Sequence, residues 1–138
     1  MESAAADAPD LSVVVPVYNE IGNLSALVER VRASLDATPW RWELVAVDDG
    51  STDGSGERLD ELAAAEPRLK VLHFAANCGQ SAGLDAGFRH ARGRLVVTID
   101  ADLQSDPADI GLLLPHLERF DAAVGIRRDR HDTGWRKL

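Results

Sequence analysis

The chain has 138 residues, of which 45% are hydrophobic; this suits one domain with a sizeable core and excludes an intrinsically disordered protein. Its formal net charge of −8 argues against a general nucleic-acid-binding protein. The single cysteine, Cys78, excludes an internal disulfide and fits a reducing compartment. No apolar run approaches the roughly 18 residues of a membrane-spanning helix.

Charge is distributed unevenly along the chain. Residues 1–126 hold 10 Lys/Arg and 21 Asp/Glu, whereas residues 127–138 hold 5 Lys/Arg and 2 Asp/Glu. A basic end on an acidic body suggests a local site for an anion such as phosphate. Residues 1–10 are Ala-rich and acidic without a secretory signal, so we expect a disordered segment there and one domain over residues 11–138.

Segments with the pattern of strands and of helices alternate along the chain. Strands are expected at residues 11–15, 43–47, 69–74, 95–99 and 122–125. Helices are expected at residues 21–37, from Asp53 as N-cap to about residue 65, at 79–91, and from Pro107 to Pro115 or slightly beyond. This alternation predicts an α/β domain with a mostly parallel, Rossmann-like sheet and helices on both faces.

Two acids, Asp100 and Asp102, directly follow the apolar strand expected at residues 95–99. Acids at the end of a buried strand are costly unless they hold something positive, and ligands of open α/β sheets bind at that end. Two carboxylates one residue apart can meet at Mg²⁺ or Mn²⁺, and Gln104 can add an oxygen. The alternative is an acidic turn without a ligand. The position at the end of an apolar strand favours a metal site, and such a metal would hold a phosphorylated substrate.

The first two expected strands are also followed by polar residues that allow two interpretations. Residues 16–20 form either a plain strand-to-helix turn or a loop that places Tyr18 against a flat base. Asp48 and Asp49 form either an ordinary turn or an acceptor for a nucleobase N–H. Asp53 is expected to serve only as an N-cap.

The loops after the third and the fifth expected strands also allow two interpretations. Residues 77–83 are small, which suits either a tightly packed helix start or a loop that approaches a ligand. Cys78 has no basic neighbour in sequence to activate it, so we expect no catalytic thiol. Arg127 and Arg130 follow the last expected strand. Such a run is usually a solvated charged surface, but here it could face the metal across a diphosphate.

Taken together, these segments resemble family 2 glycosyltransferases, which have the GT-A fold. The resemblance rests on the ordered runs at residues 11–20, 47–51, 77–80 and 100–104, which span nearly the whole chain. The run Asp-Ala-Asp-Leu-Gln, followed by Gly125, Arg127, Arg130 and Asp132, is similar to the polyprenyl-phosphate sugar transferases within that family.

The resemblance implies roles for individual residues. It implies a nucleotide-binding set consisting of Pro16, Tyr18, Glu20, Asp48, Asp49, Asp100 and Ala101. It implies that Asp100, Asp102 and Gln104 bind Mg²⁺ or Mn²⁺, which bridges the donor diphosphate. Catalytic roles fall to Asp102, Arg127 and Arg130, and the acceptor phosphate is expected to contact Arg127, Arg130 and Arg136.

The implied reaction is metal-dependent, inverting transfer of a sugar from a nucleotide diphosphate, UDP being favoured over GDP, to a polyprenyl phosphate. It would take place at the cytoplasmic, inner face of a bacterial membrane. Family members run well beyond this length, so we expect the chain to be the N-terminal, donor-binding part of a longer enzyme that meets the membrane through the missing part. Alone, it is expected to transfer sugar poorly or not at all.

Three other readings compete with this enzyme. A non-catalytic nucleotide-sugar-binding module would share the donor site, and turnover with a lipid acceptor would separate the two. A phosphatase of the haloacid dehalogenase type places its two acids after the first strand, whereas Asp100 follows the fourth expected strand. A phospho-acceptor receiver domain needs a lysine after a late strand, and residues 71–136 contain none.

Overall fold

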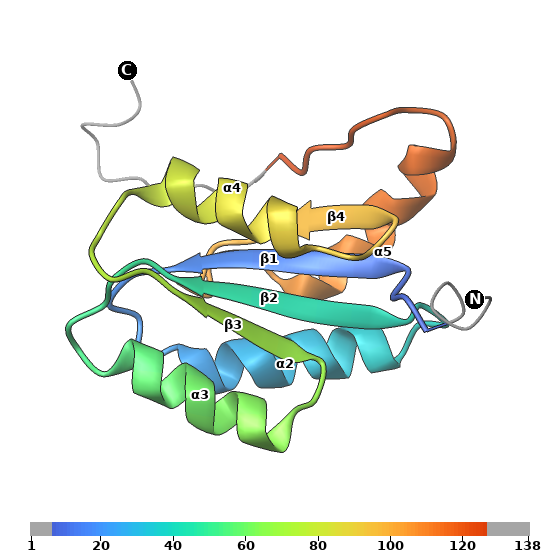
Figure 1. Cartoon of the computed structure of the whole chain (residues 1–138). Helices are drawn as coiled ribbons and strands as arrows, with labels where there is room; N and C mark the ends of the chain where they lie inside the picture. Colours follow the sequence, from blue (N-terminus) through green and yellow to red (C-terminus); the bar gives the residue numbers. More distant parts are fainter. Residues whose placement is uncertain (1–6, 127–138) are drawn as a thin grey trace, which may run out of the picture.

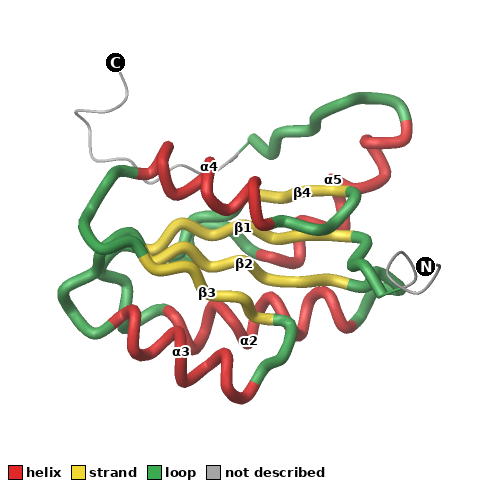
Figure 2. Tube along the Cα trace, viewed as in Figure 1, coloured by secondary structure: helices red, strands yellow, loops and turns green. Residues whose placement is uncertain are grey.

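A computed structural model describes residues 7–126 as one parallel sheet with helices on both faces (Figures 1 and 2). Its four strands stand in the order β3-β2-β1-β4. They are β1 (Leu11–Val17), β2 (Trp42–Asp48), β3 (Leu69–His73) and β4 (Leu95–Thr98). Every neighbouring pair is parallel, so the α/β prediction and the predicted parallel sheet are confirmed.

Helices α2 (Leu24–Asp36) and α3 (Ser55–Ala65) cover one face of the sheet, and α4 (Gln80–His90) covers the other (Figure 1). After β4 the chain forms η1 (Pro107–Asp109), α5 (Ile110–Leu113) and η2 (Leu114–Glu118). The helical segment therefore runs past Pro115, within the expected range. No helix among residues 7–126 is both long enough and apolar enough to cross a membrane.

The core explains why these segments fold this way. Every residue of β2 is buried, and β1 is buried throughout except at Pro16, as expected for strands covered on both faces. Helix α2 contributes an apolar stripe at helical spacing, made of Leu24, Leu27, Val28, Val31 and Leu35. On the other face, α4 lies so close to β1 that a Cβ at Gly87 would meet Val14 Cγ1. The rigid sheet thus fixes where the loops at its carboxyl edge begin.

Two sequence expectations are wrong. Residues 122–125 form no strand, because in the described part of the chain β4 pairs only with β1 and nothing pairs with this segment. Val124 is 84% exposed there, beside a cavity of about 1000 Å³ along the outer edge of β4. The N-cap of α3 is Gly54, with φ +94°, rather than Asp53. Asp53 instead accepts hydrogen bonds from the backbone N–H and hydroxyl of Ser55.

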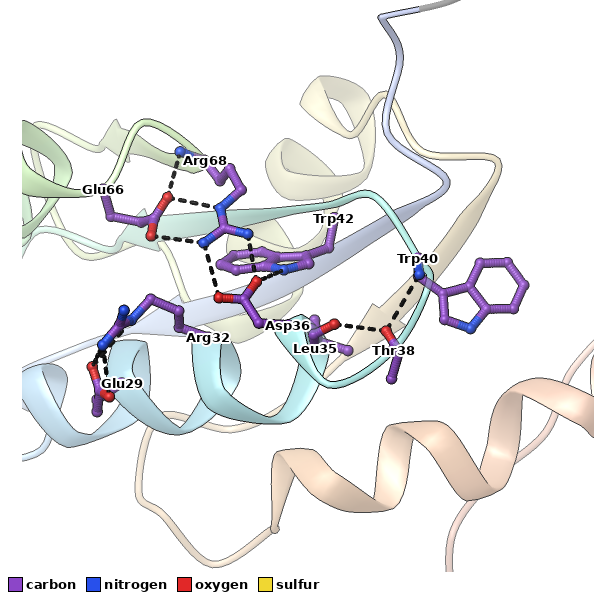
Figure 3. Close-up of polar contacts among 9 residues, drawn as sticks. All are labelled: Glu29, Arg32, Leu35, Asp36, Thr38, Trp40, Trp42, Glu66 and Arg68. Atoms are coloured by element: carbon purple, nitrogen blue, oxygen red, sulfur yellow. Dashed lines mark hydrogen bonds and ion pairs between the residues drawn. The ribbon is translucent and has the colours of Figure 1, made fainter.

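The amino ends of the strands are held by a compact polar network (Figure 3). The Trp42 indole N–H donates to Asp36 Oδ1 at 3.0 Å, and the Arg68 guanidinium lies 3.8 Å from the centre of the indole ring. Arg68 also pairs with Asp36 at 2.6 Å and with Glu66 at 2.9 Å. These contacts join the end of α2 to the starts of β2 and β3, at the opposite end of the sheet from the loops described next.

Candidate functional site

A cleft of about 370 Å³ opens at the carboxyl end of the sheet. It is lined by Pro16, Val17, Tyr18, Glu20, Asp49, Asn77, Gly79, Gln80, Asp100, Ala101 and Asp102. The chain passes from β3 back across to β4 on the far side of β1, so β1 and β4 flank the point where the strand order reverses. Ligands of open α/β sheets bind at such a point. Residues predicted from distant parts of the sequence therefore meet in one place.

Asp49 connects two loops of the cleft. The residue is 4% exposed, and its carboxylate accepts the backbone N–H groups of Cys78, at 2.6 Å, and Gly79, at 2.9 Å. The Asn77 side chain donates to it as well, at 3.1 Å. A carboxylate offers about four acceptor positions, and the loop uses three of them. The loop before α4 is thus fixed to the end of β2, with acceptor capacity left over.

Asp48 does not line the cleft, although it belongs to the predicted nucleotide-binding set. Its Oδ1 accepts the backbone N–H of Ser51 at 3.0 Å, and its Oδ2 lies 3.0 Å from His73 Nδ1. Burial works to raise the pKa of Asp48, but the hydrogen bonds from Ser51 and His73 outweigh it and hold the pKa below its usual value. Asp48 therefore supports the turn that carries Asp49, and a contact with nucleotide stays a prediction.

Gly50 makes this turn possible. It has φ +69°, and a Cβ there would lie 2.5 Å from the backbone of both Ala76 and Asn77. A side chain would therefore collide with atoms that cannot rotate away. The turn after β2 and the loop before α4 touch backbone to backbone at this glycine.

The loop after β1 is joined to the same turn. The Asn19 backbone N–H donates to Ser51 Oγ at 3.0 Å, and Asn19 Oδ1 accepts the Thr52 N–H at 2.8 Å. Asn19 itself has φ +52°, in the left-handed region that Asn adopts more readily than most residues with a side chain. Its neighbour Tyr18 lines the cleft and is 48% exposed. An exposed aromatic residue thus lines the cleft.

Asp100 and Asp102 line the cleft from the β4 side, and both are exposed. Neither forms an ion pair within residues 7–126. Asp102 Oδ1 accepts the backbone N–H of Gln104 at 3.1 Å across Leu103, which has φ +62°. Asp100 Oδ1 lies 3.4 Å from Gln80 Nε2. The two carboxylates keep oxygens available beside one cleft, and such oxygens fit a hard divalent cation.

Two acids do not complete a cation site by themselves. Within the described residues no group of three His, Cys, Asp or Glu side chains is placed to hold a metal. Mg²⁺ commonly takes one or two carboxylates together with water and substrate phosphates, so the arrangement suits a cation that arrives with a phosphorylated ligand. Gln104 lines the cavity beside β4 rather than the cleft, so its predicted metal contact stays a prediction.

Three predicted site residues lie outside the described part of the chain, and one residue near the cleft was not predicted. Arg127, Arg130 and Arg136 fall outside the residues that the structure describes. Sequence reasoning missed His73, which ends β3 level with Asp48 in the β2–β3 register. His73 could have been identified from its position at the carboxyl end of an expected strand, because the acids were identified from the same kind of position.

Comparison with known proteins places these features in a family. A family model described as "Glycosyl transferase family 2" matches residues 12–138. A dodecaprenyl-phosphate galacturonate synthase from Rhizobium johnstonii is 44% identical over 126 residues, covering 89% of this chain and 37% of that protein. An undecaprenyl-phosphate 4-deoxy-4-formamido-L-arabinose transferase from Aeromonas hydrophila is 43% identical, covering 92% of this chain and 40% of that protein.

A solved structure agrees with the fold. The mannosyltransferase PcManGT from Pyrobaculum calidifontis, in complex with GDP-Man and Mn²⁺, superimposes with a TM-score of 0.61 at 31% identity. The match covers 69% of this chain and 28% of that one. The chain spans about two fifths of the length of the two curated relatives named above.

Proposed function

The chain belongs to glycosyltransferase family 2, and on that premise we propose that its cleft binds a nucleotide-sugar donor together with Mg²⁺ or Mn²⁺. One observation carries the proposal: three loops bring an exposed aromatic ring, a carboxylate with spare acceptor capacity and two exposed carboxylates to a single cleft. A base, a ribose and a diphosphate need groups of these kinds.

Each group has a distinct task in this proposal. Tyr18 stacks on the base, which typically contributes about 1–3 kcal/mol. Asp49 offers its remaining acceptor position to a base N–H, which uracil and guanine both possess. Asp100 and Asp102 hold the cation, which supplies positive charge to the leaving diphosphate when it is bound. Pro16, Glu20 and Ala101 shape the walls of the cleft.

For the whole protein we propose transfer of the sugar to a polyprenyl phosphate, as the names of the two relatives indicate for those proteins. A phosphate oxygen of the acceptor attacks the anomeric carbon, a new C–O bond forms, and the bond to the diphosphate breaks. The nucleoside diphosphate leaves and the configuration inverts. The acceptor phosphate is already anionic near neutral pH, so no strong general base is required.

The acceptor side of the proposal rests on residues outside the described part of the chain. Arg127, Arg130 and Arg136 are proposed to bind the acceptor phosphate through charge-assisted hydrogen bonds. Since the acceptor is a membrane lipid, the reaction would take place at the cytoplasmic face of a bacterial membrane. The second candidate is a donor-binding fragment that transfers nothing by itself, because the chain spans only two fifths of these relatives.

Calorimetric titration of the chain with UDP and with GDP, each with and without Mn²⁺, tests the donor site. We expect cation-dependent binding of one nucleotide, lost in Asp102→Ala. Asp85→Ala is the matched control, because Asp85 is an exposed acid of α4 that does not line the cleft. Failure of a folded chain to bind either nucleotide, or equal binding by Asp102→Ala, would contradict the proposal.

A transfer assay separates the two candidates for the whole protein. The chain and a version extended to the length of its relatives are incubated with radiolabelled nucleotide-sugar and undecaprenyl phosphate. Labelled lipid from the extended version alone supports a donor-binding part within a longer enzyme. Equal labelling by both shows that the 138 residues suffice for transfer.

A further inference from the structure

His73, at the end of β3, lies between two carboxylates from different elements. Its Nδ1 is 3.0 Å from Asp48 Oδ2 on β2, and its Nε2 is 2.8 Å from Asp60 Oδ1 on α3. Asp48 is buried, whereas Asp60 and His73 are exposed. None of the roles proposed above uses His73 or Asp60.

Only the charged form of the ring satisfies both contacts. A neutral imidazole carries one N–H, so it can donate to one carboxylate while its bare nitrogen faces the other. The imidazolium donates to both. The charged groups facing the ring are Asp48 from β2 and Asp60 from α3, and their hydrogen bonds raise the pKa of His73 above its ordinary value.

The ring is coupled to the cleft through Asp48. The other oxygen of that carboxylate accepts the Ser51 N–H and so closes the turn that contains Asp49 and Gly50. Helix α3 packs directly against the same carboxylate, since a Cβ at Gly56 would lie 2.5 Å from Asp48 Oδ2. Asp48 is thus held by its own turn, by α3 and by the His73 ring.

We propose that charged His73 is a positioning residue for the donor site: it holds Asp48, and through the turn of residues 48–51 it holds Asp49 in place for the nucleotide. This inference rests on the proposed nucleotide-binding function of the cleft. Loss of the proton leaves one N–H, which the two tautomers divide between Asp48 and Asp60, so Asp48 is held for only part of the time and nucleotide affinity falls as the pH rises. By linkage, nucleotide binding raises the pKa of His73 further.

The test measures the Kd for UDP and for GDP, with Mg²⁺, across about pH 6 to pH 8.5, the range in which a histidine titrates. Binding of the accepted nucleotide is expected to weaken about fivefold toward the alkaline end, at the low end of typical coupling between sites. Histidine NMR signals followed in the same samples should show a higher pKa for His73 in the presence of nucleotide.

Asp60→Asn is the decisive variant. The Asn amide can donate to Nε2 of a neutral ring, whose Nδ1–H then still donates to Asp48. The Kd of this variant should stay at the tight wild-type value up to the alkaline end. His73→Phe has no N–H to donate, so at every pH it should bind at least as weakly as the wild type does at the alkaline end. His90→Phe, an exposed histidine of α4 outside the cleft, should keep the wild-type profile.

The outcomes separate the two proposals. A wild-type Kd that does not change with pH, or an Asp60→Asn profile identical to wild type, would overturn the role of His73 alone. Absence of nucleotide binding at every pH would overturn the donor site and this inference with it. If His73→Phe does not fold, Asp60→Asn still decides, because Asp60 is exposed and replaced by an isosteric side chain.

Discussion

The two acidic pairs at the carboxyl edge of the sheet have opposite surroundings. Asp48 and Asp49, after β2, are 6% and 4% exposed and make several hydrogen bonds to neighbouring loops. Asp100 and Asp102, after β4, are exposed and form no ion pair in the described part of the chain. Buried carboxylates must be partnered, so the first pair organises the cleft. The carboxylates of the second pair remain available to a ligand.

This contrast assigns stability chiefly to the first pair, of which Asp49 also faces the cleft, and cation binding to the second pair. Changes near Asp48 and Asp49 should lower the free energy of unfolding, whereas changes at Asp100 and Asp102 should leave it nearly unchanged and remove cation-dependent binding. The variants below test that separation, beginning with the largest expected loss of stability.

Gly50→Ala should destabilise the chain most. The new Cβ would lie 2.5 Å from the backbone of the next loop, at φ +69°. We expect the free energy of unfolding to fall by about 2–4 kcal/mol, since left-handed strain and a backbone displacement add. Urea unfolding measures this. Gly22→Ala is the control, because a Cβ there meets nothing within 4 Å. Equal, small losses in both variants would contradict the close contact at Gly50.

Asp49→Asn should cost less but should still affect both properties. One acceptor oxygen becomes an NH₂ group, so one of the loop N–H groups that face it loses its partner. A buried donor left unpaired costs about 1–3 kcal/mol. Urea unfolding and nucleotide titration should both register the change. A variant with wild-type stability would show that the carboxylate does not hold the loop of residues 77–79.

The Asp48–His73 contact should give a smaller, pH-dependent effect on stability. The pKa of His73 is raised on folding, so its stabilisation is complete below its ordinary value of 6.5 and is lost as the pH rises through the folded-state value. The pKa of Asp48 is lowered, so its stabilisation is present above 3.8 and is lost as the pH falls below that. Urea unfolding should therefore show a decline on each side of that interval.

Asp60→Asn tests which group causes the alkaline decline. The variant lowers the pKa of His73 toward its ordinary value, so the alkaline decline should shrink while the acid decline persists. Persistence of the full alkaline decline in Asp60→Asn would contradict the bridge.

The smallest loss of stability is expected for Asp100→Asn and Asp102→Asn. Both side chains are exposed, and surface substitutions typically change stability by about 0.5 kcal/mol or less. Cation-dependent nucleotide binding should nevertheless disappear from each. If either variant loses as much free energy of unfolding as Asp49→Asn does, the two acidic pairs do not differ in their contribution to stability.

Most of the fold could be predicted from the sequence, because the apolar runs of β1 to β4 and the helical spacing of α2 are strong local patterns. The wrong elements depend on context instead. A strand at residues 122–125 would need a neighbouring strand to pair with, and the described part of the chain has none beside this segment. The start of α3 depended on the left-handed conformation of Gly54, which carries no apolar pattern.

The site shows the same division between local and tertiary information. Convergence of loops at strand ends follows from a parallel sheet, so the meeting of Asp49 with Asp100 and Asp102 could be expected. The sequence did not indicate which of the two adjacent acids, Asp48 or Asp49, faces the cleft. Successive side chains of a strand point to opposite faces, and the sequence alone does not say which face each one takes. The partnership of Asp48 with His73 required the β2–β3 register and the close approach of α3, neither of which a single sequence displays.

The claim that Asp100 and Asp102 hold the cation is tested most directly by locating the bound ion. Mn²⁺ added with the accepted nucleotide to the isotopically labelled chain broadens amide NMR signals near the ion. We expect broadening centred on residues 100–102, and its loss in the Asp100→Asn/Asp102→Asn double variant with the remaining spectrum unchanged. Broadening centred away from the end of β4, or undiminished in the folded double variant, would contradict the claim that these two carboxylates hold the cation.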